Sequence, residues 1–169
     1  MAALLHRHFV EVRNEGGRKL AGMAAVYGVE TDIGAFKERI RPGAFERTLS
    51  SDADVLAFAD HDPSKLLGRR STGTLRLSDT DDGLLFELDV PDTATGRDVL
   101  ALADRGDLGG MSFGFLVRDG GEMRDGDVRV LTDIDLREIS VVSAWPAYSG
   151  TSVEARSKQV KSPSFWRWR

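Results

Sequence analysis

The feature that most constrains this fold is a succession of short apolar or alternating segments divided by turn-rich stretches. Glycine accounts for 18 of the 169 residues, and most of these glycines lie between the segments. Short runs of this kind are typical of β-strands, whereas helices need longer segments with a helical period. Seven runs are expected to form strands, namely 19–27, 36–40, 74–78, 84–90, 111–118, 128–134 and 136–143.

Two short segments have helical signals. Residues 44–49 follow a Pro-Gly pair that is typical of a helix start. A second helix is expected after Thr93 or Thr95, either of which can cap it, because the apolar residues within 99–103 recur at helical spacing. The expected fold class is therefore α+β and mainly β, with a β-barrel or sandwich of about seven strands and short peripheral helices.

Charge divides the chain into an acidic body and a basic tail. Residues 155–169 contain five basic residues and no acidic ones, and the whole chain carries −4, so residues 1–154 carry −9. We expect 1–154 to form one domain and 155–169 to be a disordered tail. Nucleic-acid binding is not an expected function, because an acidic body repels the phosphate backbone.

Composition also limits the compartment and the chemistry. The chain contains no cysteine, which excludes a disulfide scaffold and a cysteine nucleophile. No stretch approaches the length of a membrane span, and the N-terminus lacks an apolar region of signal-peptide length. We therefore expect a soluble intracellular protein.

A single histidine occupies the middle of the chain. His6 and His8 lie near the N-terminus, which we expect to be mobile, whereas His61 follows a short apolar run at 55–59. If the chain uses a histidine as a general base, His61 is the candidate. A lone histidine in a solvated turn is the alternative interpretation.

A glycine-rich segment carries the candidate nucleophile. The segment 110–114 has the letters of the Gly-x-Ser-x-Gly elbow, but it is expected to continue as a strand instead of entering a helix. The glycines around Ser112 let the backbone approach a substrate, and the N–H groups there can form an oxyanion hole. A serine hydroxyl needs a base to become a nucleophile, so without His61 an ordinary turn serine is the better interpretation.

The third candidate is a carboxylate in the last expected strand. Side chains alternate along 136–142, so Glu138 and Ser140 point to the same face. A carboxylate on the cleft side can orient a histidine ring and stabilise the imidazolium. Asp133 and Asp135 compete for this role, and an ion pair with an arginine is the alternative interpretation of Glu138.

Metal and cofactor chemistry are not expected. Asp60 and Asp62 flank His61 as possible ligands, but the chain has no pair of histidines at helical metal-binding spacing. A phosphate-binding loop of the Gly-x-x-x-x-Gly-Lys type is also absent from the sequence.

Five motif-bearing segments follow one another along the chain, at 22–28, 40–45, 58–68, 110–115 and 136–148. Together they resemble the prohead maturation serine proteases of tailed bacteriophages, which are related in fold to the herpesvirus assembly proteases. Each segment is a weak signal by itself, whereas five in this order are specific. The resemblance covers roughly residues 18–152, nearly the whole acidic body.

The resemblance implies a herpesvirus-protease-like β-barrel and a serine endopeptidase that cleaves capsid and scaffold protein during prohead maturation. By match to the family motifs, Ser112 is the nucleophile, His61 the general base and Glu138 the third member. It implies no cofactor. Its implied partners are the major capsid protein with its scaffolding segment, and a second copy of the enzyme in autoproteolysis and in a homodimer. The implied location is the host cytoplasm, inside the prohead.

Two other functions fit the same residues. One is a catalytically inactive capsid-assembly (scaffolding) protein on the same fold, although the presence of both His61 and Ser112 favours an enzyme. The other is an unrelated hydrolase such as an esterase, which would use the same three side chains.

Overall fold

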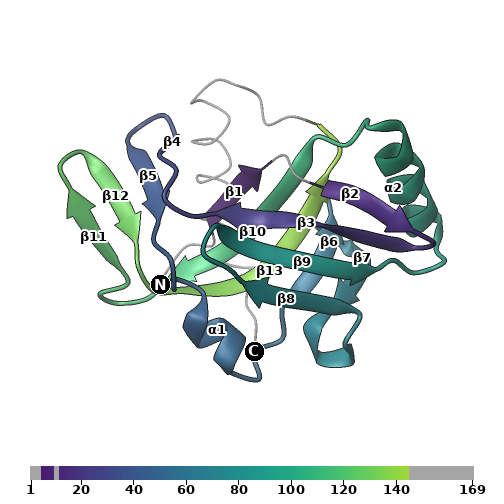
Figure 1. The fold of residues 1–169 in the computed structure, drawn as a ribbon, viewed down its shortest axis with the longest axis horizontal. Helices are drawn as coiled ribbons and strands as arrows, with labels where there is room; N and C mark the ends of the chain where they lie inside the picture. The colour runs from purple at the N-terminus through teal and green to yellow at the C-terminus, as the bar shows by residue number, and fades with distance from the viewer. Residues whose placement is uncertain (1–4, 10–11, 145–169) are drawn as a thin grey trace.

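The structure, a computed structural model, describes residues 5–9 and 12–144, and their strands form three sheets (Figure 1). The largest sheet contains or adjoins every candidate site residue. Its strands, in spatial order, are β1 (Leu5–Phe9), β10 (Gly110–Val117), β13 (Ile134–Val142), β6 (Leu56–Ala59) and β7 (Asp62–Arg69).

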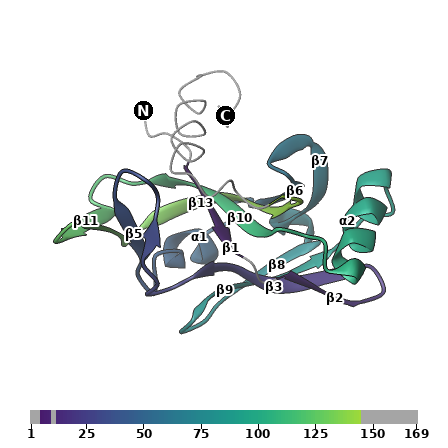
Figure 2. The same ribbon diagram turned by 90° about the horizontal axis from the view of Figure 1, so that it is seen from above.

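Two four-stranded sheets complete the β structure. One faces the five-stranded sheet, as the view from above shows (Figure 2), and consists of β2 (Val12–Gly16), β3 (Lys19–Val26), β9 (Gly83–Asp89) and β8 (Leu75–Asp79). The other extends from one end of this sandwich and consists of β11 (Glu122–Asp125), β12 (Val128–Leu131), β5 (Lys37–Ile40) and β4 (Thr31–Asp32).

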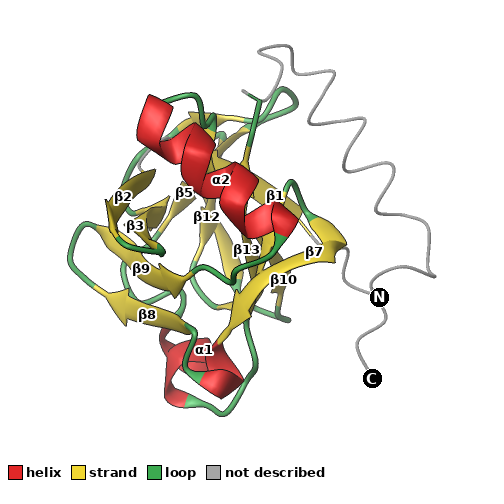
Figure 3. Ribbon diagram, turned by 90° about the vertical axis from the view of Figure 1, so that its right-hand side faces the viewer, coloured by secondary structure: helices red, strands yellow, loops and turns green. Residues whose placement is uncertain are grey.

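The helices lie at the periphery. Helix α2 (Ala94–Arg105) covers the end of the sandwich opposite the small sheet, where it crosses in front of the strands in Figure 3. Helix α1 (Glu46–Ser50) packs against β13, and a 3-10 turn at Arg70–Thr72 connects β7 to β8. Short peripheral helices are therefore confirmed.

The mainly β class is confirmed, but no closed barrel is found among the described residues. β7 and β8 are consecutive in the chain but are not hydrogen-bonded to each other. Each is the edge strand of its own sheet, so the two large sheets do not join at this side. Several strands also escape sequence-based prediction. β11 is almost entirely charged, and β7 contains Pro63. β1 lies in the N-terminal segment that is expected to be mobile, and β2 follows it in a stretch with no strand pattern.

The core lies between the two larger sheets. On β10, Met111, Phe113 and Phe115 are fully buried in the apolar cluster, and the rings of the two phenylalanines stack at 5.3 Å between centroids. Because side chains alternate along a strand, Ser112 and Gly114 lie on the face turned away from this core. The aromatic side of β10 thus determines which face presents the serine.

A β-bulge in β13 changes the direction of the side chains around it. The ladder with β10 skips Arg137. For this reason Leu136 and Ile139 both belong to the core cluster, although they are an odd number of positions apart. Glu138 then lies on the opposite face, the same face as Ser112.

Helix α2 begins and ends at residues with clear capping signals. The Thr93 hydroxyl accepts the backbone N–H of Gly96 at 3.1 Å, so Thr93, and not Thr95, is the N-cap. Gly106 ends the helix with a left-handed φ of 73°.

Helix α1 ends against the guanidinium group of Arg70. This group donates hydrogen bonds of 2.5 to 3.0 Å to the backbone carbonyls of Thr48, Leu49, Ser51 and Ala53. A short helix leaves its last carbonyls without intrahelical partners, and a cation at this end satisfies them.

An Arg70→Met variant is expected to unfold with a free energy about 2 kcal/mol lower than wild type, because four carbonyl acceptors lose a charged donor. Urea unfolding at constant pH measures the difference. Arg97→Met is the control, since Arg97 pairs with Asp92 on the exposed surface of α2 and should cost less than about 0.5 kcal/mol. Equal losses in the two variants would contradict the capping role of Arg70.

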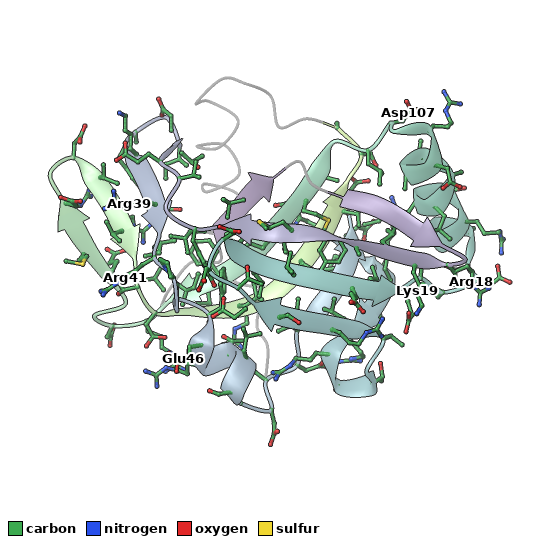
Figure 4. All side chains as sticks on the ribbon, viewed as in Figure 1. Arg18, Lys19, Arg39, Arg41, Glu46 and Asp107 are labelled. Carbon is green, nitrogen blue, oxygen red and sulfur yellow. The ribbon has the colours of Figure 1, made fainter. Side chains whose placement is uncertain are left out.

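Basic residues of the acidic body lie beside carboxylates at both ends of the molecule. Arg39, at the end formed by the small sheet, contacts Glu30 and Asp125. Arg18, at the α2 end, contacts Asp92. Figure 4 labels both arginines. Such exposed pairs contribute little stability individually.

Some expectations concern residues outside those described. The domain limit at 154, the basic tail at 155–169 and residues 145–148 of the last motif all lie there. Within the described residues, no helix combines the length and apolar character that crossing a membrane requires.

Candidate active site

His61 lies in a two-residue turn between β6 and β7. Asp60 and His61 have φ values of 52° and 57°. Left-handed conformations at both central residues are typical of a type I′ hairpin turn, where glycine and asparagine are preferred. A histidine in this conformation is strained by about 1 to 2 kcal/mol, and such strain is concentrated at functional sites.

Strand β13 holds this turn in place. The Asp60 N–H donates to the carbonyl of Val141 at 2.8 Å. The Asp60 carboxylate accepts the backbone N–H of Ser143 at 2.7 Å and its hydroxyl at 2.9 Å. The His61 N–H donates to the Ser140 hydroxyl oxygen at 3.2 Å. These contacts fasten the strained turn to the end of β13.

The imidazole of His61 lies between Ser112 and Glu138. Its Nε2 is 2.7 Å from Ser112 Oγ, and its Nδ1 is 2.6 Å from Glu138 Oε1. Ser112 and Glu138 have no exposed surface, whereas 14% of the His61 side chain is exposed. Both distances are within hydrogen-bond range, so the three candidate residues form one continuous hydrogen-bonded line, which we call the triad.

The Glu138 carboxylate has a second neighbour and a specific space. The Ser140 hydroxyl donates to Oε2 at 2.7 Å. Across the ladder lies Gly114, where a Cβ atom would be only 2.6 Å from Oε1. Glycine at position 114 therefore leaves open the volume in which the carboxylate meets the histidine.

A Gly114→Ala variant is expected to lose about 100-fold in kcat on any substrate of this site, because its methyl group displaces the Glu138 carboxylate from His61. The displaced atom ends a flexible side chain, so the melting temperature should change little. Steady-state kinetics and thermal unfolding measure the two effects. An unchanged kcat would show that the carboxylate can move without consequence.

The competing acidic residues of the last strand have other partners. Asp133 accepts hydrogen bonds from Nη2 and Nε of Arg47, the shortest at 2.7 and 3.1 Å. Asp135 accepts one from Arg118 at 2.8 Å. Glu138 is therefore the carboxylate of this segment that reaches the histidine. The alternative interpretation, in which Glu138 only forms an ion pair with an arginine, does not account for its contact with His61.

The Asp62 carboxylate is hydrogen-bonded to Ser64 within β7. It accepts the hydroxyl and the backbone N–H of Ser64, and these hydrogen bonds lower its pKa. Among residues 5–9 and 12–144, no group of three or more His, Asp or Glu side chains is arranged to hold a metal ion.

The glycine-rich segment is part of a central strand. β10 pairs with β1 on one side and β13 on the other, and the N–H of Gly109 donates to the carbonyl of Val142 at 2.8 Å. The N–H of Gly109 is therefore already paired in this conformation and is not available as an oxyanion donor. Ser112 lies within the strand, so the turn-serine interpretation is wrong.

Asp60 and Ser140 lie within the motif-bearing segments, but sequence analysis gives neither of them a role beside the histidine. The alternation of a strand is the signal that points to Ser140, because residues two apart share a face. The contact of Asp60 with Ser143 depends on the parallel pairing of β6 with β13, which has no local sequence signature.

Comparison with known proteins identifies the family to which this chain belongs. The sequence matches the family described as caudovirus prohead serine protease over residues 7–164. The structure is similar to that of the capsid assembly protease of bacteriophage T4, with a TM-score of 0.59 and 11% identity over 85% of this chain and 99% of that chain, which shows a shared fold. No curated protein matches the chain in sequence. Because the family match spans nearly the whole length, the protein belongs to the caudovirus prohead serine protease family.

Proposed function

We propose that this protein is a serine endopeptidase that cleaves capsid and scaffold protein during prohead maturation. The observation that carries the proposal is the hydrogen-bonded line from Ser112 through His61 to Glu138. These residue types in this order are those of a hydrolytic triad. Membership of the prohead protease family supports capsid protein as the substrate class.

In the proposed mechanism, Ser112 is the nucleophile and His61 the general base. The Ser112 oxygen bonds to the scissile carbonyl carbon while its proton passes to Nε2 of His61. The tetrahedral intermediate then expels the amine, which takes that proton, and an acyl-enzyme remains. Water then attacks the acyl carbon while its proton passes to Nε2. The second tetrahedral intermediate expels the Ser112 oxygen, which takes that proton back, and the new carboxyl group is released.

Glu138 is proposed to fix the orientation of the imidazole. When the Nδ1–H group donates a hydrogen bond to Oε1, the lone pair of Nε2 faces Ser112. Proton transfer from the serine requires this arrangement. Burial of the carboxylate strengthens its attraction for the imidazolium that forms during the reaction.

Substrate binding in this proposal includes a local rearrangement. Ser112 has no exposed surface, so a peptide carbonyl reaches its hydroxyl only after neighbouring residues move. His61 is the one exposed member of the triad and marks the side of approach. The expected partners are the major capsid protein with its scaffolding segment, and a second copy of the enzyme in autoproteolysis and in a homodimer.

The test is incubation of the purified protein with the major capsid protein of the same phage, followed by intact mass spectrometry. We expect capsid protein shortened at its N-terminus, together with the complementary fragment. Pretreatment with a fluorophosphonate should stop cleavage and leave one adduct, on the peptide that contains Ser112.

Full-length capsid protein in assembled shells, with no adduct on the protein, would contradict the protease and favour the inactive capsid-assembly protein. Turnover of esters without turnover of any capsid-derived peptide would favour the unrelated esterase.

A further inference from the structure

Ser140 joins two parts of the site that come from different elements. Its hydroxyl donates to Glu138 Oε2 at 2.7 Å, and its oxygen accepts the backbone N–H of His61 at 3.2 Å. Ser140 is fully buried and lies directly opposite Ser112 in the ladder between β13 and β10. One side chain therefore contacts both the carboxylate and the backbone of the histidine.

The two contacts restrict different motions. A donor on Oε2 of Glu138 limits rotation of the carboxylate, whose terminal torsion is otherwise broad, and keeps Oε1 facing the imidazole. An acceptor for the His61 N–H holds a residue whose left-handed backbone is strained. Together they fix the position of the ring relative to the carboxylate, and a small misplacement of a catalytic group lowers the rate steeply.

We propose that Ser140 is a positioning residue that locks the Glu138 carboxylate and the His61 turn in a single geometry. It acts through these two residues and not on the substrate. The proposal deepens the proposed function and rests on it, since the locked geometry serves catalysis only if the triad is catalytic.

The test compares Ser140→Ala with Thr48→Val. Thr48 is a matched control because its hydroxyl is also buried and also bonds to β13, donating to the Ile134 carbonyl at 3.3 Å and accepting the Leu136 N–H at 3.1 Å. It holds the opposite end of the strand, away from the triad. Both variants should lose similar thermal stability.

Kinetics on a capsid-derived peptide should separate the two variants. We expect Ser140→Ala to lower kcat by about 10- to 100-fold and to leave KM within about twofold of wild type. Thr48→Val should leave both constants within about twofold of wild type. A kcat in Ser140→Ala equal to that of Thr48→Val would overturn the proposal.

A second readout does not depend on turnover. In protein labelled with ¹⁵N-histidine, the short bond from His61 Nδ1 to Glu138 should give a strongly downfield proton resonance, identified by its loss in Glu138→Gln. We expect this resonance to broaden or move upfield in Ser140→Ala and to persist in Thr48→Val. An unchanged resonance in Ser140→Ala would overturn the proposal. The resonance could also be lost in Ser140→Ala while the wild-type protein cleaves no substrate. That combination would support the positioning role of Ser140 and contradict the protease function.

Discussion

A Ser112→Ala variant is expected to cleave a capsid-derived peptide with a kcat about 10⁶-fold below that of wild type, as for other serine hydrolases without their nucleophile. The reason is that no acyl-enzyme can form, so only binding and any oxyanion contacts remain to accelerate hydrolysis. The variant loses one buried hydroxyl from a strand paired on both sides and should remain folded. Product formation over long incubations measures the residual rate.

His61→Gly supplies an independent check on the same mechanism. Glycine adopts the left-handed conformation of this position without steric cost, so the turn should persist while the base is lost. If the two residues act as one unit, the double variant with Ser112→Ala is no slower than either single variant. Ser112→Ala activity within about tenfold of wild type would exclude Ser112 as the nucleophile.

A Glu138→Gln variant is expected to lower kcat by about 10⁴-fold with little change in KM. The amide has the same shape, but it carries no charge to stabilise the imidazolium, and its NH₂ group favours the tautomer that leaves Nε2 protonated. The Nε2 lone pair is then no longer available to accept the Ser112 proton. Steady-state kinetics measure the loss, and ¹⁵N-histidine spectra report the tautomer directly.

Glu38→Gln is the matched control for this variant. Glu38 is also a buried strand glutamate, only 2% exposed, and it accepts a hydrogen bond from Arg129 at 3.2 Å in the small sheet. Its replacement should destabilise the fold without affecting kcat, because it lies outside the triad. A kcat for Glu138→Gln no lower than that for Glu38→Gln would remove Glu138 from the mechanism.

Strands with a strong apolar pattern could be predicted from the sequence. β3, β9, β10 and β13 largely coincide with runs that alternate or are continuously apolar, because each has a side in the core, although β13 already begins at Ile134, where the preceding expected strand ends. β11 and β7 could not be predicted, since their residues are mostly exposed and their pairing depends on neighbours elsewhere in the chain. The expected barrel failed for a similar reason: whether a sheet closes depends on which edges pair, not on the period of any strand.

The candidate site likewise divides into features that the sequence could predict and features that it could not. Local pattern was enough to single out His61, Ser112 and Glu138, because a central histidine, a serine among glycines and an alternating strand are all visible in short windows. The match to the family motifs favours Glu138 over Asp133 and Asp135, but the features that distinguish it, namely the bulge at Arg137 and the arginine partners of the two aspartates, appear only in the structure. No window of sequence contains that information.

By itself, the sequence determined the mainly β class, the resemblance to prohead proteases that the family match confirmed, and the residue types available for catalysis. Only the tertiary structure decided that His61 lies within hydrogen-bond distance of two residues 51 and 77 positions away. It also revealed the strained turn, the space left by Gly114 and the double contact of Ser140. The physical reason is that side-chain patterns report burial and period, whereas these contacts follow from the parallel pairing of β6 with β13 and the register of β10.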